Sequence, residues 1–274
     1  MMDNLRMFLA AVLQLNCTSD AESNWRQAED LVHRAAGYGA RLIATPENTN
    51  FLGPHDQKVE RAESLDGPTC SRFSSLAADL EVFLLLGSFN ETSQDPGRCH
   101  NTSVLFSPRG ERLAVYRKIH LFDVDVSPEV RFQESATVKA GEGTVVVTTE
   151  LGKLGLSICY DLRFPGLYQQ LRDEGAEILT VPSAFTLTTG RDHWEPLLRA
   201  RAIETQCWVL AAAQWGKHDD VGLRESYGHA MIVDPWGHVV AMADDGPGLA
   251  LAEVDMKGVH RARNAIPVQD HRKI

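Results

Sequence analysis

Short runs of consecutive apolar residues alternate along this chain with longer stretches in which apolar positions lie three or four residues apart. Residues 6–16 form the first such run and predict a strand, and a helical stretch follows it. A second apolar run, at residues 41–45, ends at Pro46, which lacks the N–H needed to continue a strand. The chain therefore opens with a predicted strand–helix–strand unit. The apolar positions of its helix are Trp25, Ala28, Leu31, Val32 and Ala35.

The same alternation continues to the end of the chain, and two pairs of strands are predicted to form hairpins across turns at 108–110 and 151–153. The run at 207–213 is apolar at every position, as expected for a strand covered on both faces. No Ser/Gly-rich linker or low-complexity tract interrupts the pattern, so we expect one α/β domain over residues 1–274. The further predicted strands are residues 82–89, 102–106, 112–116, 145–149, 154–158, 177–181, 207–213, 230–233, 238–241 and 249–254, and the further predicted helices are residues 71–80, 165–174 and 193–205.

The composition is that of an ordinary globular protein, with 43% hydrophobic and 23% charged residues. Asp and Glu total 37 against 27 for Lys and Arg, which gives a net charge of −10. A surface of this charge repels phosphate backbones and anionic lipids, so we expect neither nucleic acid nor a membrane as a partner. The apolar start of the chain is not followed by a signal-peptide cleavage site, and no run approaches the roughly 20 residues of a membrane span.

The five cysteines form no C-x-x-C pair, and an odd number argues against a disulfide framework. Reduced thiols and a cytoplasmic location are therefore expected. The ten histidines show no H-E-x-x-H pattern or other zinc-ligand spacing, and no glycine-rich phosphate-binding loop occurs. We therefore expect neither a metal site nor a cofactor.

Candidate catalytic residues lie where predicted strands end. Glu47 follows one strand in T-P-E-N, Lys118 follows another in Y-R-K-I-H, and Cys159 follows a third in L-S-I-C-Y-D-L-R-F-P. Sites in α/β sheets gather at the carboxyl ends of strands, so these three residues could converge. Taken singly, each has a plainer interpretation: a helix-capping glutamate, a solvated lysine and a buried structural cysteine.

Together, the three residue types suit acyl transfer. A cysteine attacks as the thiolate, which the positive charge of Lys118 would favour. Glu47 could take the thiol proton, pass it to departing ammonia and then activate the water that cleaves the thioester. Backbone N–H groups after Cys159, together with Lys118, could hold the oxyanion. The pattern predicts an enzyme that hydrolyses a small amide.

In these contexts the Glu, Lys and Cys closely resemble those of the nitrilase, or carbon-nitrogen hydrolase, superfamily, from residue 8 to about residue 272. The resemblance implies a four-layer αββα sandwich, a homodimer or larger homo-oligomer, and catalytic roles for Glu47, Lys118 and Cys159. The segment F-Q-E-S-A-T-V-K-A-G resembles an element that often provides a second glutamate in this family. The resemblance thus implies that Glu134 orients the substrate and supports the lysine, whereas the plainer interpretation is a surface carboxylate in a turn.

The residues after the cysteine indicate a branch of the superfamily. True nitrilases typically have C-W-E, whereas C-Y-D-L-R-F-P resembles an amidase branch whose members act on deaminated glutathione or, as ω-amidases, on 2-oxo acid amides. The segments that begin at His193 and Tyr227 resemble the former group, and Y-R-K-I-H-L-F-D-V-D-V resembles the latter at least as much. We expect a primary amide of a small carboxylated compound to be converted to acid and ammonia, with deaminated glutathione as the preferred substrate. The alternatives are an ω-amidase, an N-carbamoyl amino acid hydrolase, a nitrilase and, from another class, a non-catalytic binding or scaffold protein.

Four residues are candidates for substrate binding. The planar guanidinium of Arg163 suits a carboxylate next to the scissile amide, and an ion pair with Asp161 or another acid is an equally open interpretation. Tyr160 lies beside the cysteine, and Phe185 and Thr186 follow the predicted strand 177–181. We expect these three residues to line the pocket.

Overall fold

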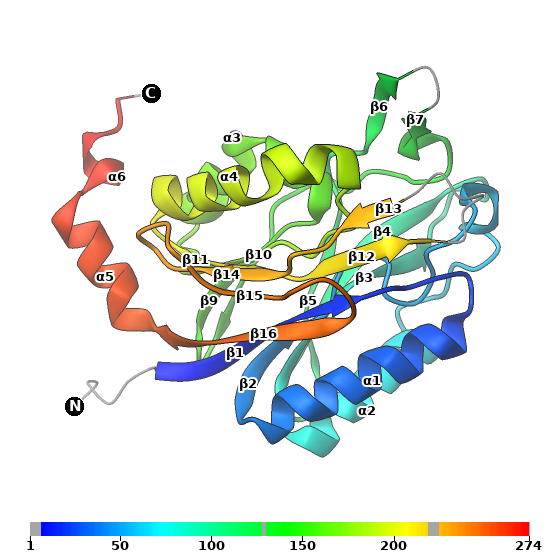
Figure 1. Cartoon of the computed structure of the whole chain (residues 1–274), viewed down its shortest axis with the longest axis horizontal. Coiled ribbons are helices and arrows are strands. Elements are labelled where there is room, and N and C mark those ends of the chain that lie inside the picture. The colour runs from blue at the N-terminus through cyan, green and yellow to red at the C-terminus, as the bar shows by residue number, and fades with distance from the viewer. Residues whose placement is uncertain (1–6, 128–129, 219–224, 274) are drawn as a thin grey trace.

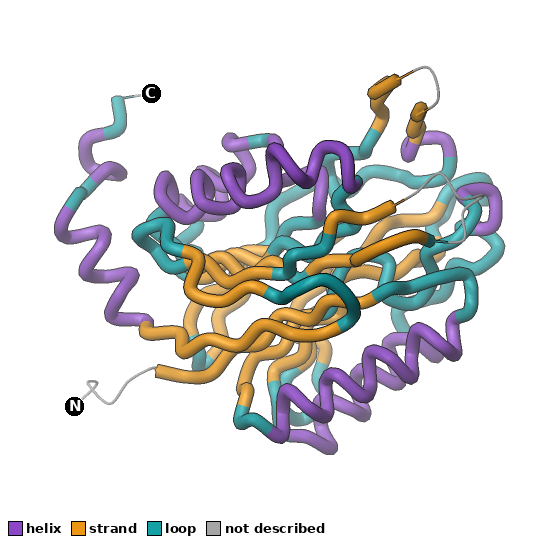
Figure 2. The backbone as a smooth tube through the Cα atoms, in the orientation of Figure 1, coloured by secondary structure: helices purple, strands orange, loops and turns teal. Residues whose placement is uncertain are grey.

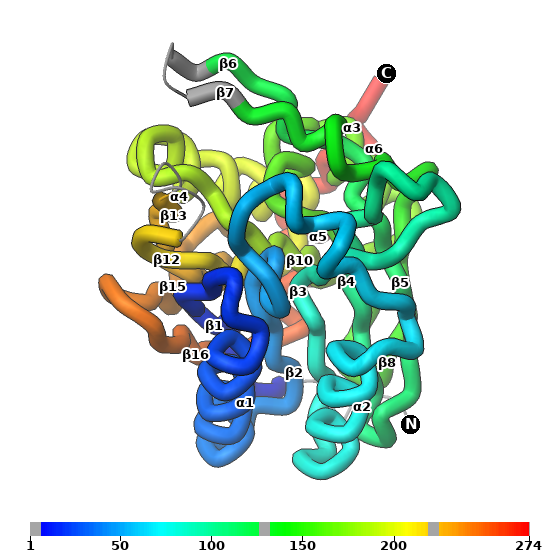
Figure 3. Tube along the Cα trace, turned by 90° about the vertical axis from the view of Figure 1, so that its right-hand side faces the viewer, coloured from blue at the N-terminus to red at the C-terminus, as the bar shows by residue number. Residues whose placement is uncertain are grey.

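A computed structural model describes residues 7–127, 130–218 and 225–273; residue 6, the first of the predicted opening strand, lies outside them. Two β-sheets pack face to face, and helices cover their outer faces (Figure 1). The helices α1 (Ala21–Gly37) and α2 (Pro68–Leu80) lie side by side on the first sheet (Figure 3), and α3 (Pro165–Asp173) and α4 (Leu187–Thr205) cover the second. The predicted four-layer αββα sandwich is therefore confirmed.

The first sheet has the strand order β13-β12-β1-β2-β3-β4-β5, and β16 also pairs with β1. Its strands β1, β2 and β3 run parallel because α1 and α2 return the chain between them, and β4 and β5 continue the sheet as antiparallel neighbours. Figure 2 shows the strands of the two sheets in the middle of the molecule and helices outside them. The strands are β1 (Met7–Leu15), β2 (Ala40–Ala44), β3 (Phe83–Thr92), β4 (Cys99–Phe106), β5 (Arg112–Arg117), β12 (Ala213–Lys217), β13 (Glu225–Tyr227) and β16 (Gly248–Asp255).

The second sheet has the strand order β15-β14-β11-β10-β9-β8. Its three central strands are parallel, and the two outer pairs at its ends are antiparallel. The strands are β8 (Val146–Thr149), β9 (Gly152–Leu156), β10 (Ile178–Thr180), β11 (Trp208–Ala211), β14 (Met231–Val233) and β15 (Val239–Met242).

Apolar side chains fill both sides of each sheet. Along β3, Leu84 and Leu86 pack toward α1 and α2, whereas Leu85 belongs to the core that includes the second sheet. This burial on both faces explains why central strands such as β1, β3 and β11 appear in the sequence as largely continuous apolar runs, whereas β5, β8 and β15 at the sheet edges are partly exposed.

One predicted strand is wrong in a way that matters for the fold. Residues 207–213 do not form a single strand, because β11 ends in the second sheet at Ala211 and β12 begins in the first sheet at Ala213. The chain therefore crosses between the sheets at Ala212. Both strands are buried, so the apolar pattern does not show where the chain leaves one sheet for the other.

Other elements were mispredicted or missed. The helix α4 begins at Leu187 rather than at residue 193, because its first turn is rich in threonine and lacks an apolar period. The hairpin of β6 (Asp123–Ser127) and β7 (Val130–Gln133) and the C-terminal helices α5 (Met256–Ala265) and α6 (Val268–His271) were not predicted. Among the described residues, no helix is both long enough and apolar enough to cross a membrane.

Candidate active site

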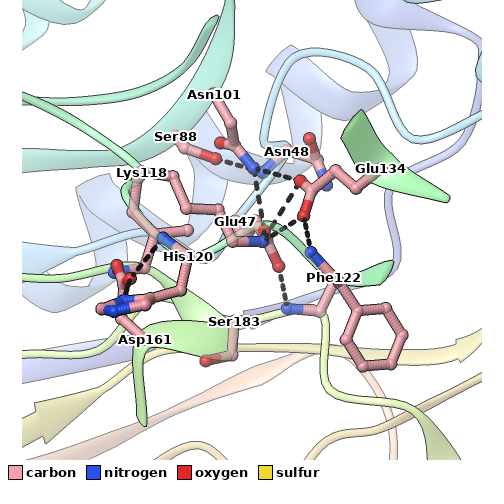
Figure 4. Close-up of polar contacts among 12 residues, drawn as sticks. Glu47, Asn48, Ser88, Asn101, Lys118, His120, Phe122, Glu134, Asp161 and Ser183 are labelled. Carbon is pink, nitrogen blue, oxygen red and sulfur yellow. Dashed lines mark hydrogen bonds and ion pairs between the residues drawn. The ribbon is translucent and has the colours of Figure 1, made fainter. Parts of the chain in front are cut away.

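Glu47, Lys118, Glu134 and Cys159 lie together at one edge of the sandwich, where they line one pocket. Figure 4 shows the polar contacts of Glu47, Lys118 and Glu134. The Lys118 ammonium lies between the two glutamates, with its Nζ 2.9 Å from Glu47 Oε1 and 2.9 Å from Glu134 Oε2. The Cys159 thiol lies close enough to the Glu47 carboxylate for each group to shift the pKa of the other. The three residues predicted from separate strand ends thus share one buried cluster with Glu134, which the family resemblance implied.

Glu47 is held in place by a close approach of backbone segments. The chain leaves β2 through Thr45 and Pro46, whose carbonyl oxygens lie so near Gly87 in β3 that any side chain there would collide with them. The Ala184 N–H donates a hydrogen bond of 2.8 Å to Glu47 Oε2. Both sheets therefore contribute to the orientation of this carboxylate.

Cys159 opens a 3₁₀ turn, Cys159–Arg163, that follows β9. Its φ of +46° lies in the left-handed region, which costs a residue with a side chain roughly 1–2 kcal/mol. The Cys159 N–H donates to the carbonyl oxygen of Pro182 at 3.0 Å, which holds the backbone in this conformation. Strained backbone of this kind clusters at functional sites.

Asp161 ties this turn to the segment that contains Lys118. Its fully buried carboxylate accepts hydrogen bonds from the Tyr116 hydroxyl (2.7 Å), the His120 N–H (3.1 Å), the His120 ring Nδ1 (2.7 Å) and the Ile158 N–H (2.9 Å). The turn and the end of β5 are therefore held at a fixed separation.

The two glutamates differ in how fully their oxygens are used. Glu134 accepts from Lys118 at both oxygens (3.2 and 2.9 Å), from Asn101 Nδ2 at Oε1 (3.3 Å) and from the Phe122 N–H at Oε2 (2.7 Å). Glu47 Oε1 also accepts two bonds, from Lys118 and Asn101, but Oε2 accepts only one backbone N–H. A carboxylate oxygen offers about two acceptor positions. Glu47 therefore keeps one position for the thiol proton, and Glu134 does not.

The cluster is ionised around Lys118. Burial alone would lower the pKa of Lys118, but the negative charges of Glu134 and Glu47 outweigh it and raise the pKa well above its usual value. Burial would raise the pKa of both glutamates, but the Lys118 ammonium reverses this effect, so the pKa of Glu47 is lowered and that of Glu134 falls to about 2. The cluster therefore holds two carboxylates and an ammonium group at neutral pH.

The Cys159 thiol, in contrast, is protonated in the free protein. Burial raises its pKa, the negative charge of Glu47 raises it further, and the Lys118 ammonium offsets only part of this. Lys118 does lower the pKa of the thiol, as expected, but this effect is smaller than the combined effect of burial and Glu47. In this arrangement a thiolate forms as the proton moves to Glu47.

A pocket opens above the cluster, and all four residues predicted to bind substrate line it: Tyr160, Arg163, Phe185 and Thr186. Several other lining residues were not identified from the sequence. They are Asn48, His55, Lys58, Phe122, Phe132, Ala184 and Thr189.

Arg163 is oriented by contacts on the wall of the pocket. Its guanidinium lies over the Phe185 ring at 4.9 Å, and its Nη1 is 3.2 Å from Nδ1 of His193. It forms no ion pair with Asp161, whose oxygens accept the hydrogen bonds described above, so an ion pair between these two residues is excluded. The guanidinium is therefore available to a ligand in the pocket.

Asn101 is the residue of the cluster that sequence reasoning missed most plainly. The predicted hairpin contained the signal, because its register pairs Thr102 with Arg117 and so brings Asn101 opposite Lys118. The Lys118 N–H indeed donates to the Asn101 carbonyl oxygen at 2.9 Å. Among the described residues, no group of three or more His, Cys, Asp or Glu side chains is placed to hold a metal ion.

Solved structures with the same architecture define the class. The chain superimposes on the Caenorhabditis elegans NitFhit protein with a TM-score of 0.92 and 40% identity, covering 98% of this chain and 65% of that longer one. It superimposes on Saccharomyces cerevisiae Nit3, a member of branch 10 of the nitrilase superfamily, with a TM-score of 0.88 and 30% identity over 98% of this chain and 97% of that one. The fold is that of the nitrilase superfamily.

Sequence comparison then gives the family. Residues 9–264 match the carbon-nitrogen hydrolase family. A deaminated glutathione amidase from Synechocystis is 43% identical over 271 residues, which cover 98% of this chain and 99% of that protein. The chain belongs to the carbon-nitrogen hydrolase family, whose members are enzymes that hydrolyse carbon–nitrogen bonds.

Proposed function

We propose that this protein is an amidase that works through a thioester at Cys159, with Glu47 as general base and acid, Lys118 as the cation beside the oxyanion, and Glu134 as the partner that orients Lys118. One observation supports this most directly. The buried Cys159 thiol lies beside a carboxylate, that of Glu47, which has an acceptor position left for its proton, and the Lys118 ammonium is hydrogen-bonded to the same carboxylate.

The reaction follows from these contacts. As the sulfur of Cys159 attacks the amide carbon, its proton moves to Glu47, and the oxygen that becomes negative is stabilised by Lys118 and by backbone N–H groups after Cys159, beginning with that of Tyr160. The same proton then passes from Glu47 to the departing nitrogen, which leaves a thioester. Glu47 next removes a proton from water, the hydroxide adds to the thioester, and the proton returns to sulfur as the acid leaves.

The names of similar proteins suggest the substrate. Curated relatives at 43–44% identity over nearly the whole chain are called deaminated glutathione amidase, so we propose deaminated glutathione as the first substrate. Arg163 on the pocket wall supplies a cation for a carboxylate of the substrate, and Tyr160, Phe185 and Thr186 line the space around it. The reactive amide of that tripeptide derivative is secondary and releases an amine, so the expectation of a primary amide and of ammonia does not fit this substrate. Ammonia is expected instead from the 2-oxo acid amides, the N-carbamoyl amino acids and the nitriles.

Trapping the acyl intermediate tests the mechanism. Acid quenching during turnover, followed by mass spectrometry of peptides, should show the acyl group of the substrate on Cys159. Cys159→Ala should show neither adduct nor turnover, whereas Cys207→Ala, which changes another fully buried thiol, should retain both. Full turnover by Cys159→Ala would disprove the mechanism.

A panel of substrates tests the specificity. Hydrolysis of deaminated glutathione, 2-oxoglutaramate, an N-carbamoyl amino acid and a nitrile should be compared at equal concentration, with deaminated glutathione expected to give the highest kcat/KM. A higher value for 2-oxoglutaramate would assign the protein to the ω-amidases. Inertness toward all four, with Cys159 still open to alkylation, would favour a binding or scaffold role.

We also propose that residues 1–274 act as one domain, in the cytoplasm, as a homodimer or larger homo-oligomer. Large apolar side chains are exposed on α4, on the turn before β15 and on β15 itself, namely Ile203, Trp236, Val240 and Met242, and a second copy of the chain could cover them. Light scattering after size exclusion should give a multiple of 30.3 kDa. A monomer at micromolar concentration would contradict this part of the proposal.

A further inference from the structure

Asn101, near the start of β4, lies in the middle of the buried carboxylate cluster and is 1% exposed. Its side-chain Nδ2 donates to Glu47 Oε1 at 2.9 Å and to Glu134 Oε1 at 3.3 Å (Figure 4). Among the described residues, only the side chains of Asn101 and Lys118 donate hydrogen bonds to both carboxylates. A single amide group therefore bridges two like charges.

The other end of this amide is left without a partner. Asn101 Oδ1 is buried and has no hydrogen-bond donor, a condition that costs about 1–3 kcal/mol. Turning the amide over would place this oxygen against two carboxylates, which would be worse. The side chain is thus oriented by the carboxylates, and the fold tolerates an unpaired acceptor in order to keep the donor between them.

The backbone of the same residue fixes the ammonium. The Asn101 carbonyl oxygen accepts the N–H of Lys118, so one residue sets the position of the Lys118 main chain and of the carboxylates that its ammonium touches. With Lys118 it also fills both acceptor positions of Glu47 Oε1. The position that remains is on Oε2, and the thiol can use it.

We infer that Asn101 is a positioning residue for the amidase reaction: its amide holds Glu47 with one oxygen open to Cys159 and favours the ionised form of both glutamates. It touches neither the substrate nor the reacting sulfur. This inference rests on the proposed function, because it assigns Asn101 an effect on the general base of that reaction. Hydrogen bonds to a charged carboxylate lower its proton affinity, so loss of this donor should be visible in the pH dependence.

The first test is Asn101→Leu, which keeps the approximate size of the side chain and removes both its donor and its unpaired acceptor. The melting temperature should fall, because Glu47 and Glu134 each lose a donor. The value of kcat/KM, measured well below the melting temperature, should also fall tenfold or more, and the acidic limb of its pH profile should move to higher pH. A purely structural residue would lose stability and leave the position of the limb unchanged.

A second variant tests whether the acidic limb moves further when a negative charge is added. Asn101→Asp keeps the size but adds a third carboxylate beside Lys118, so the cluster should bind a proton more tightly and the acidic limb should lie at higher pH than in Asn101→Leu. Asn90→Leu is the matched control. Asn90 pairs with Asn101 across β3 and β4 and is fully buried, but its side-chain contact is with Cys99 and not with the carboxylates. This control should keep the wild-type limb.

Alkylation separates failure of this inference from failure of the proposed function. The rate of iodoacetamide modification of Cys159, followed by mass spectrometry across pH, reports on proton transfer to Glu47 without any natural substrate. If the wild type hydrolyses no amide, the proposed function fails, and the alkylation profiles of Asn101→Leu and Asn90→Leu still decide the role of Asn101. Profiles of Asn101→Leu that match the wild type in both rate and pH limb would overturn the inference.

Discussion

The pocket has a floor and a rim that are built differently. We define the floor as Glu47, Asn101, Lys118, Glu134 and Cys159, and the rim as Phe122, Phe132, Tyr160, Arg163 and Phe185. The floor comes from strand ends and adjoining turns, is nearly excluded from water and is bound by short hydrogen bonds. The rim consists mainly of aromatic rings in contact with one another, together with one arginine over a ring.

This difference indicates a division of work. Hydrogen bonds and charges in the floor orient Glu47, the acceptor of the thiol proton. Such groups stabilise mainly the transition state, so substitutions in the floor should lower kcat. Ring contacts in the rim tolerate small rearrangements, and they touch parts of a ligand that do not react. Changes in the rim should alter KM and the choice of substrate.

Glu47→Gln should have the largest effect, because the amide cannot take the thiol proton. A fall in kcat of roughly 10²–10⁴-fold is expected, with a small change in KM. Steady-state kinetics on deaminated glutathione would measure both. Glu91→Gln is the control, since Glu91 is an equally buried carboxylate that pairs with Arg117 and lies outside the floor. A similar loss in both variants would show that the effect is one of folding.

Glu134→Gln should lower kcat less, by about 10–100-fold, because this carboxylate orients Lys118 without accepting the proton. It also offers a test of stability. The pKa of Glu134 is lowered from 4.5 to about 2 in the folded protein, so the carboxylate stabilises the fold above pH 4.5, and this contribution is lost as the pH falls toward 2. Urea unfolding should therefore show a smaller loss of stability in the variant than in the wild type between about pH 5 and pH 3. An equal loss in the two proteins would contradict the lowered pKa.

Arg163→Lys probes the rim. The change keeps the charge but removes the planar group that lies over Phe185, so KM for a carboxylated amide should rise about tenfold, while kcat changes little. Arg199→Lys, on the same side of the second sheet but bonded to the Gly237 carbonyl oxygen, serves as the control. If kcat fell and KM stayed constant, Arg163 would belong functionally with the floor.

Phe132→Leu should have the smallest effect. Its ring packs at 5.5 Å from Phe122, and loss of one such aromatic contact changes binding by about threefold. The ratio of kcat/KM for deaminated glutathione to that for 2-oxoglutaramate should fall, because the larger substrate reaches further along the rim. Phe73→Leu, in the core beneath α1 and α2, should lower the melting temperature and leave this ratio unchanged.

The same contrast explains what could be predicted from the sequence. Glu47, Lys118, Glu134 and Cys159 each follow an apolar strand or stand in a recognisable motif, so their proximity could be expected. Asn101 lies inside a strand and has no motif, and its role depends on the register of β4 against β5. Phe122 and Phe132 lie at the base of the β6–β7 hairpin, whose short D-V-D-V-S and V-R-F-Q segments alternate polar and apolar residues, a strand signal that was missed.

The fold was predictable for strands that are buried on both faces, because their sequences are largely continuous apolar runs. These strands form the middle of both sheets. It was not predictable at Ala212, where two buried strands meet with no polar residue between them. The short strand β13 has one buried residue, Ser226, and so shows no apolar pattern. The helix α5 buries Met256, Val259 and Ala262 at a helical spacing, so its period was present in the sequence and was missed.

The hydrogen bond between the Phe122 N–H and Glu134 Oε2 allows a backbone amide to report on the ionisation of the floor. This amide closes the base of the β6–β7 hairpin, together with the bond from the Glu134 N–H to the Phe122 carbonyl oxygen. The amide proton of Phe122 is therefore hydrogen-bonded to a carboxylate oxygen whose charge depends on every group of the cluster. In an NMR spectrum, the chemical shift and exchange rate of this one amide would record ionisation of the cluster in the resting enzyme, before any substrate is added.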